Sequence, residues 1–291
     1  MSVAVAMRLG RVSNLPTVWT NALAGTVLAG GDPWTLSALL AALGLSLLYV
    51  SGMYLNDAFD RDIDAAERPT RPIPANLVAT NTVFAAGFAL MLAGLTFVLW
   101  ASAVASPPTG WRPVLAGLAL GGAIVFYDWH HKGNRASPFF MGLCRVLAYL
   151  TAGYAAVAAP SPMLYLAAAV SLSYLIGLTF VAKQEALDRL SSLWPLLFLT
   201  APIVYGLVRI GQAGALGGLL LLALAAWVLT ALFFLKRRAK GDVPRAVVGL
   251  IAGIALLDAL FLAYADALAA AGLAAVCFLS TLALQRWVSG T

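Results

Sequence analysis

Three polar side chains recur every four residues near position 60 of the chain. Asn56, Asp60 and Asp64 follow a long apolar segment, and a helix that continues through them places all three on one face. A divalent cation relieves the repulsion on such a face, and Mg²⁺ is usually held by one or two carboxylates together with substrate phosphates. The spacing therefore predicts a Mg²⁺–diphosphate site with these three residues as metal ligands. Asp57 lies on the same turn and is a further candidate ligand, whereas Asp62 is expected to face away into solvent.

Three arginines lie close to this acidic row in the sequence. Arg61, Arg68 and Arg71 are candidate diphosphate ligands, because a guanidinium grips phosphate oxygens through two parallel hydrogen bonds. Alternatively, each arginine has no role in binding and only contributes to the excess of Lys and Arg in the cytoplasmic loops of membrane proteins.

The composition indicates which kind of protein carries this site. Of the 291 residues, 62% are hydrophobic and 10% are charged, whereas soluble domains average about 25% charged residues. The mean hydropathy is +0.90. A soluble core cannot hide so much apolar surface, so the composition excludes a soluble enzyme, a disordered protein and a nucleic-acid-binding protein. We expect an all-α, polytopic transmembrane helical bundle that forms a single domain over residues 1–291.

A membrane-spanning helix needs about 20 mostly apolar residues, and ten segments of the chain qualify. These segments are 12–30, 35–55, 77–101, 113–129, 138–159, 163–182, 190–210, 214–235, 246–265 and 268–287. The last two are divided only by Asp266 and its neighbours, so nine or ten spans are expected.

The basic residues predict how these spans are oriented. With a cytoplasmic N-terminus, all but three of the 18 Lys and Arg residues fall in cytoplasmic segments, as the positive-inside rule requires. We therefore expect an integral multi-pass protein of the cell membrane, with the N-terminus and the acidic row on the cytoplasmic side.

The run NDAFDRDID from Asn56 to Asp64, followed by RPTRPIP from Arg68, resembles the first aspartate-rich motif of the UbiA superfamily of intramembrane prenyltransferases. That motif has the form Asn-x-x-x-Asp-x-x-x-Asp and follows the second span. The resemblance covers most of the chain and implies a helical bundle, usually of nine spans, with Mg²⁺ as cofactor. It implies an isoprenyl diphosphate and a lipophilic or aromatic acceptor as partners within the lipid bilayer. Asp60 and Asp64 are then expected to be catalytic.

Further site residues are implied by the same resemblance. Tyr127 and Lys132 match a tyrosine followed by a lysine that faces the diphosphate, so both are expected to bind substrate and Lys132 to assist catalysis. The family's second motif, two aspartates four residues apart, corresponds to Gln184 and Asp188. Asp188 is therefore an expected catalytic residue and metal ligand, whereas Gln184 departs from the pattern. Either Glu185 replaces the missing ligand or one metal site is weakened.

Two polar residues inside predicted spans complete the candidate site. Arg145 is unfavourable in lipid, so we expect it to face a polar cavity or a carboxylate and to contact the diphosphate or the acceptor. Asn21 lies where the family often has polar residues near its acceptor pocket. Hydrogen bonding between helices is an equal alternative for Asn21.

The motifs together predict a Mg²⁺-dependent transfer of an isoprenyl group from an allylic diphosphate to an acceptor in the membrane, with release of diphosphate. The alternative is a catalytically weakened, prenyltransferase-like protein that binds or moves a lipid-linked metabolite, and Gln184 favours it. A lipid-headgroup transferase would need a different signature, with Asp-Gly, Ala-Arg and a Gly ahead of Asp-x-x-x-Asp. That signature is absent from the sequence.

Overall fold

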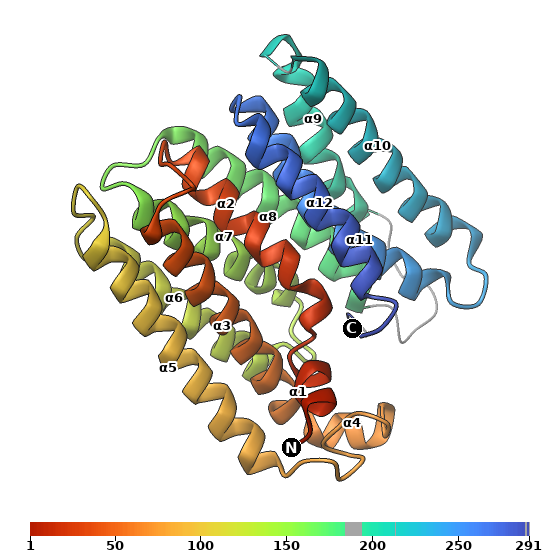
Figure 1. Cartoon of the computed structure of the whole chain (residues 1–291). Coiled ribbons are helices and arrows are strands. Elements are labelled where there is room, and N and C mark those ends of the chain that lie inside the picture. Colours follow the sequence, from red (N-terminus) through yellow and green to blue (C-terminus); the bar gives the residue numbers. More distant parts are fainter. Residues whose placement is uncertain (184–193, 213, 289, 291) are drawn as a thin grey trace.

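The computed structural model describes residues 1–183, 194–212, 214–288 and 290. In these ranges the chain forms twelve α-helices with short 3₁₀ segments, and no β-strand occurs among them. Figure 1 shows the long helices lying side by side in one bundle. The α-helices are α1 (Val3–Leu9), α2 (Leu15–Leu28), α3 (Leu36–Phe59), α4 (Arg61–Glu67), α5 (Thr80–Val104), α6 (Arg112–His130), α7 (Ser137–Ala156), α8 (Pro162–Lys183), α9 (Ala201–Val208), α10 (Gly214–Arg237), α11 (Asp242–Tyr264) and α12 (Leu268–Leu284).

Nine of the ten predicted apolar segments each coincide with one long α-helix. The remaining segment, 190–210, corresponds to a 3₁₀ helix over Trp194–Thr200 that leads into α9, and its first residues lie outside the described ranges. By length and composition, six of the described helices can cross a membrane, namely α3, α5, α7, α8, α10 and α11. The all-helical architecture is therefore confirmed, whereas the expected number of nine or ten spans is not.

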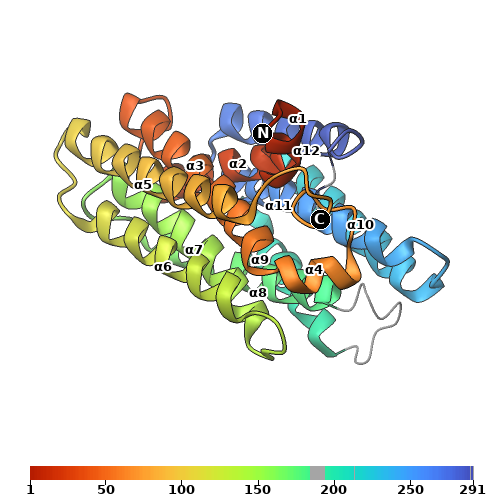
Figure 2. The ribbon, with the colours of Figure 1, turned by 90° about the horizontal axis from the view of Figure 1, so that it is seen from below.

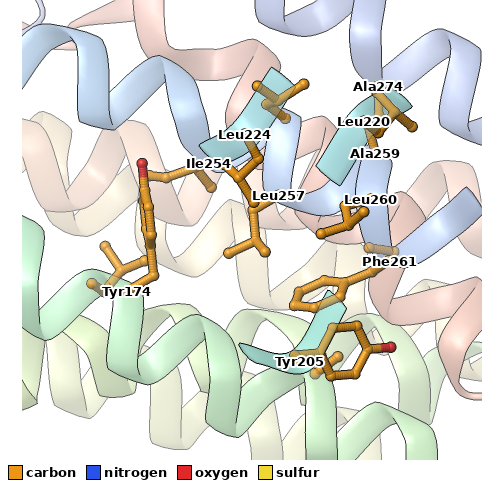
Figure 3. Packing of buried hydrophobic residues seen from close by; sticks show 14 of the residues in the cluster. Tyr174, Tyr205, Leu220, Leu224, Ile254, Leu257, Ala259, Leu260, Phe261 and Ala274 are labelled. Atoms are coloured by element: carbon orange, nitrogen blue, oxygen red, sulfur yellow. The ribbon is translucent and has the colours of Figure 1, made fainter. Parts of the chain in front are cut away.

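Helix α11 lies at the centre of the bundle, where it contacts α2, α8, α10 and α12. Its residues from Ala252 to Tyr264 are all buried, so this helix is covered on every side. Figure 3 shows the packing around it, with the ring of Phe261 close to that of Tyr205. The two rings meet edge to face, with their centroids 5.1 Å apart. A helix that is apolar around its whole circumference is expected in such a buried position.

One carboxylate lies inside this apolar core. Asp258 of α11 accepts a hydrogen bond from the Tyr149 hydroxyl of α7 and another, at 2.6 Å, from the Thr20 hydroxyl of α2. All three residues are fully buried. A buried polar group is tolerated when hydrogen bonds replace its water. The carboxylate therefore ties three helices together at the centre of the bundle.

The end of the bundle near α4 gathers segments that are far apart in the sequence. Figure 2 shows this end with the N-terminus, α4 and the C-terminus. Arg8 donates a hydrogen bond to the backbone oxygen of Thr70 at 2.9 Å, and Lys183 donates one to that of Asn134 at 2.6 Å. Basic side chains thus meet loop carbonyls here, as expected for segments that leave an apolar bundle.

The backbones of α3 and α5 approach each other at Gly44 and Gly94. A Cβ atom built on Gly94 would lie 2.8 Å from the carbonyl oxygen of Gly44 and 2.9 Å from Cγ of Leu48. Neither neighbour is the far end of a flexible chain, so this contact leaves no room for a side chain. It fixes how α3 lies along α5 and thereby where the end of α3 is placed.

We predict that Gly94→Ala destabilises the protein by about 1–3 kcal/mol, the usual penalty for overpacking. The matched control is Gly122→Ala on α6, because a Cβ at Gly122 meets no atom within 4 Å. Alanine favours a helix over glycine, so the control is expected to be neutral or slightly stabilising. Thermal unfolding of both variants in detergent checks this, and equal melting temperatures would contradict the close packing.

Candidate active site

The acidic row lies at the junction of α3 and α4. Asp60 sits between the two helices, and its backbone N–H bonds to the carbonyl of Asn56 at 2.9 Å. The N–H of Asp64 bonds in turn to the carbonyl of Asp60 at 2.8 Å. Because this four-residue hydrogen-bond pattern continues across the junction, Asn56, Asp60 and Asp64 keep the helical spacing that the sequence predicts. All three side chains are buried.

Two arginines hold the carboxylates of this row. Arg71 Nη1 lies 2.7 Å from Asp64 Oδ2 and 3.2 Å from Asp57 Oδ1. Arg11 Nη2 lies 3.0 Å from the same Asp57 oxygen and donates to Asn56 Oδ1 at 3.2 Å. Both guanidinium groups are largely buried, so their attraction to the carboxylates is only weakly screened by water.

Arg11 is a site residue that sequence reasoning missed. It lies between α1 and the 3₁₀ segment Val12–Asn14, with its backbone in the left-handed region at φ 41°. A non-glycine residue in this region costs about 1–3 kcal/mol and persists only where its surroundings hold it. The ion pair with Asp57 is one such restraint.

Asp60 contacts a different pair of basic side chains. His131 Nε2 and Lys132 Nζ each lie 3.4 Å from Asp60 Oδ2. Burial raises the pKa of the Asp60 carboxyl, but the hydrogen bonds and charges of His131 and Lys132 outweigh burial and bring the pKa below its usual range. Asp60 is therefore ionised at neutral pH. His131, whose ring stacks on that of Tyr127 with centroids 4.8 Å apart, was not expected in the site.

Arg61 and Arg68, the other two arginines expected to bind diphosphate, do not pair with the row as Arg71 does. Arg61 is exposed and pairs at 3.4 Å with Asp62, which is more exposed still and faces solvent as expected. Arg68 is half-buried, and its backbone N–H bonds to the carbonyl of Asp64. Among the described residues, Arg71 is thus the one arginine of the three that pairs with a carboxylate of the row.

A small cavity begins next to the row and extends among the apolar helices. Its volume is about 120 Å³. Most of its wall is apolar, with side chains such as Val18 and Leu45. Three expected substrate contacts, Asn21, Tyr127 and Arg145, line it together with Asp128. Arg145 Nη1 donates to Asn21 Oδ1 at 3.3 Å and to the backbone oxygen of Thr17 at 3.1 Å.

The remaining expected site residues, Glu185 and Asp188, lie with Gln184 outside the described residues. Across the part of the chain that is described, no group of three His, Cys, Asp or Glu side chains is placed to hold a metal ion. The donor set nevertheless suits Mg²⁺, which prefers oxygen ligands. One carboxylate oxygen of Asp64 and one of Asp128 are buried without a hydrogen-bond partner in this part of the chain.

Comparisons with known proteins identify relatives of the chain. The sequence profile of the UbiA prenyltransferase family matches residues 17–248. A chloroplastic chlorophyll synthase from Oryza sativa subsp. japonica is 34% identical over 119 residues, which cover 38% of this chain and 30% of that protein. The match therefore spans less than a third of that relative. A digeranylgeranylglyceryl phosphate synthase from Methanopyrus kandleri is 28% identical over 208 residues, 69% of each chain.

Solved structures share the fold. A UbiA homologue from Aeropyrum pernix K1 aligns with a TM-score of 0.64 and 16% identity, over 85% of this chain and 94% of the other. A homologue from Archaeoglobus fulgidus, solved with GPP and Mg²⁺ bound, aligns with a TM-score of 0.61 and 16% identity, over 91% and 99%. Since the family profile covers well over half of the residues, the chain belongs to the UbiA prenyltransferase family.

Proposed function

We propose that this protein transfers an isoprenyl group from an allylic diphosphate to a lipophilic, in particular aromatic, acceptor within the membrane, in a Mg²⁺-dependent reaction that releases diphosphate. The observation that carries this proposal is the buried row of Asn56, Asp60 and Asp64 with its basic partners, placed beside a largely apolar cavity. The Archaeoglobus fulgidus homologue with bound GPP and Mg²⁺ supports the choice of substrate and cofactor.

The oxygen ligands for Mg²⁺ are proposed to come from Asn56, Asp57, Asp60 and Asp64, together with Glu185 and Asp188 from the second motif. When bound, the cation neutralises charge that develops on the leaving diphosphate. The low pKa of Asp60 keeps this carboxyl ionised and ready to bind a cation at neutral pH.

The basic residues are proposed to exchange partners when substrate binds. Arg71 and Lys132 lie against carboxylates of the row. With a cation held at the row, Arg71 and Lys132 would no longer have to balance these carboxylates and could donate hydrogen bonds to diphosphate oxygens. Arg71 and Lys132 are better supported in this role than Arg61 and Arg68, which have no carboxylate partner in the row among the described residues.

The apolar lining of the cavity suits the reacting end of the organic substrate. The bond between the allylic carbon and the diphosphate oxygen breaks, and its electron pair leaves with the diphosphate. The acceptor then bonds to the electron-poor carbon and loses a proton. Apolar walls exclude the water that would otherwise capture this carbon. Tyr127, Arg145 and Asn21 line the cavity and are proposed to contact the acceptor or the diphosphate.

We propose that the bundle lies in the cell membrane with the acidic row at its cytoplasmic face. The bias of Lys and Arg toward these loops supports this orientation. The isoprenoid tail would then reach the site from the lipid, while the diphosphate stays at the aqueous boundary.

The proposed activity is tested by the release of pyrophosphate from geranyl, farnesyl and geranylgeranyl diphosphates with Mg²⁺ and a lipid extract as acceptor source. We predict that Asp60→Asn lowers this release by about 100-fold or more, because the negative charge that would hold Mg²⁺ beside the leaving diphosphate is lost. Asp62→Asn is the matched control and is expected to retain activity, because Asp62 is exposed. Magnesium-dependent binding of the diphosphates without any release would instead favour a protein that binds or moves a lipid-linked metabolite, as the neutral Gln184 suggests.

Arg71 is also predicted to be required for stability when no substrate is present. Arg71→Met leaves two buried carboxylates without this cation, and breaking a buried ion pair costs about 3–5 kcal/mol. Arg61→Met removes a cation of the same kind from an exposed pair, which is worth at most about 1 kcal/mol. Differential scanning fluorimetry in detergent compares the two variants. A melting temperature that falls equally in both would argue against the buried pairs.

A further inference from the structure

Asp128 is a buried carboxylate at the end of α6 that the sequence did not assign to the site. It is 5% exposed. Its Oδ1 accepts a hydrogen bond from Asn56 Nδ2 at 3.2 Å. Its Oδ2 is buried and has no hydrogen-bond partner among the described residues. A carboxylate oxygen in this state has lost its water without a replacement, which is unfavourable.

Asp128 differs from the other buried carboxylates at this end of the bundle. Asp57 and Asp64 pair with arginine at 3.2 Å or less, and Asp60 lies 3.4 Å from both His131 and Lys132. The carboxylate of Asp128 forms no salt bridge with a Lys, Arg or His side chain in the part of the chain that is described. A buried charge without a partner is strongly unfavourable, so this position is suited to a cation that the chain does not itself supply.

The position of Asp128 points to the cation concerned. Asp128 is hydrogen-bonded to Asn56, the first residue of the row. It also lines the cavity together with Tyr127 and Arg145. It therefore lies where the proposed diphosphate site meets the proposed isoprenoid site. The other proposed ligands among the described residues come from α3, α4 and the junction between them, whereas Asp128 comes from α6.

We propose that Asp128 is a further ligand of the divalent cation that accompanies the diphosphate. This inference rests on the proposed function and adds a residue to its metal site. The additional carboxylate also supplies negative charge that the second motif lacks, because Gln184 is neutral where the resemblance implies an aspartate. Mg²⁺ accepts such a hard oxygen ligand readily.

Asp128→Asn separates ligation from a purely structural role. Asparagine has nearly the same shape, and its amide oxygen can still accept the hydrogen bond from Asn56, so a residue that only positions Asn56 would be replaced without loss. The variant removes the negative charge with which a carboxylate attracts a divalent cation. The two side chains have nearly the same size, so the metal-free variant is expected to melt at about the same temperature as the wild type.

The test uses Mn²⁺ as a paramagnetic substitute for Mg²⁺, and inorganic pyrophosphate as the diphosphate probe. Electron paramagnetic resonance of free Mn²⁺ gives the dissociation constant for the purified full-length protein in detergent, with and without pyrophosphate. We expect Asp128→Asn to weaken Mn²⁺ binding by about tenfold or more. Asp62→Asn, which changes an exposed carboxylate on α4, is the control and is expected to bind Mn²⁺ as the wild type does.

Each outcome decides the proposal. Unchanged Mn²⁺ affinity in Asp128→Asn, with normal binding by the wild type, would overturn the role of Asp128 and leave the proposed function intact. A lower metal-free melting temperature with unchanged Mn²⁺ affinity would give Asp128 a structural role instead. Absence of Mn²⁺ binding by the wild type, even with pyrophosphate, would overturn the proposed metal–diphosphate site itself and Asp128 with it.

Discussion

The burial of carboxylates at the end of an apolar helical bundle is the constraint on which this structure depends. Asp57, Asp60 and Asp64 are each less than a tenth exposed, and an isolated carboxylate in such a place would be strongly unfavourable. Basic groups from three separate parts of the chain meet them: Arg11 ahead of α2, Arg71 beyond α4, and His131 with Lys132 after α6. The loops at this end are thus held together by charge, while the helices are held by apolar packing around α11.

The pairing of buried carboxylates with basic side chains affects both the stability of the protein and the proposed chemistry. Arg11 and Arg71 pair with Asp57 and Asp64, so basic groups of the chain itself offset much of the cost of burying these acids. A site that binds a metal–diphosphate pair needs negative groups to hold the cation and positive groups to hold the phosphate oxygens. Carboxylates and basic side chains already lie together and largely buried at the row. The proposed binding of a cation and a diphosphate would therefore require little more than an exchange of partners. The largely apolar cavity beside the row is the proposed place for the reacting end of the isoprenoid.

Much of the fold and part of the site follow from the sequence, for physical reasons. The long apolar segments coincide with helices because burial in lipid and a twenty-residue span leave few alternatives. The row of Asn56, Asp60 and Asp64 follows from helical periodicity, which is local. Arg11 was missed because 45 residues separate it from Asn56, and its pairing depends on how α1 returns toward α3. The close approach of Gly44 and Gly94 is likewise a tertiary contact that no local pattern indicates.

The central claim is that the diphosphate and its cation bind at the row of Asn56, Asp60 and Asp64. The most direct measurement is an anomalous difference map from crystals grown with Mn²⁺ and a thiolo analogue of geranyl diphosphate, which resists cleavage. The account predicts a manganese peak beside these carboxylates, with the Arg71 guanidinium turned from Asp64 toward the diphosphate. A diphosphate bound elsewhere, or an Arg71–Asp64 pair that stays intact with the ligand present and no manganese at the row, would contradict it.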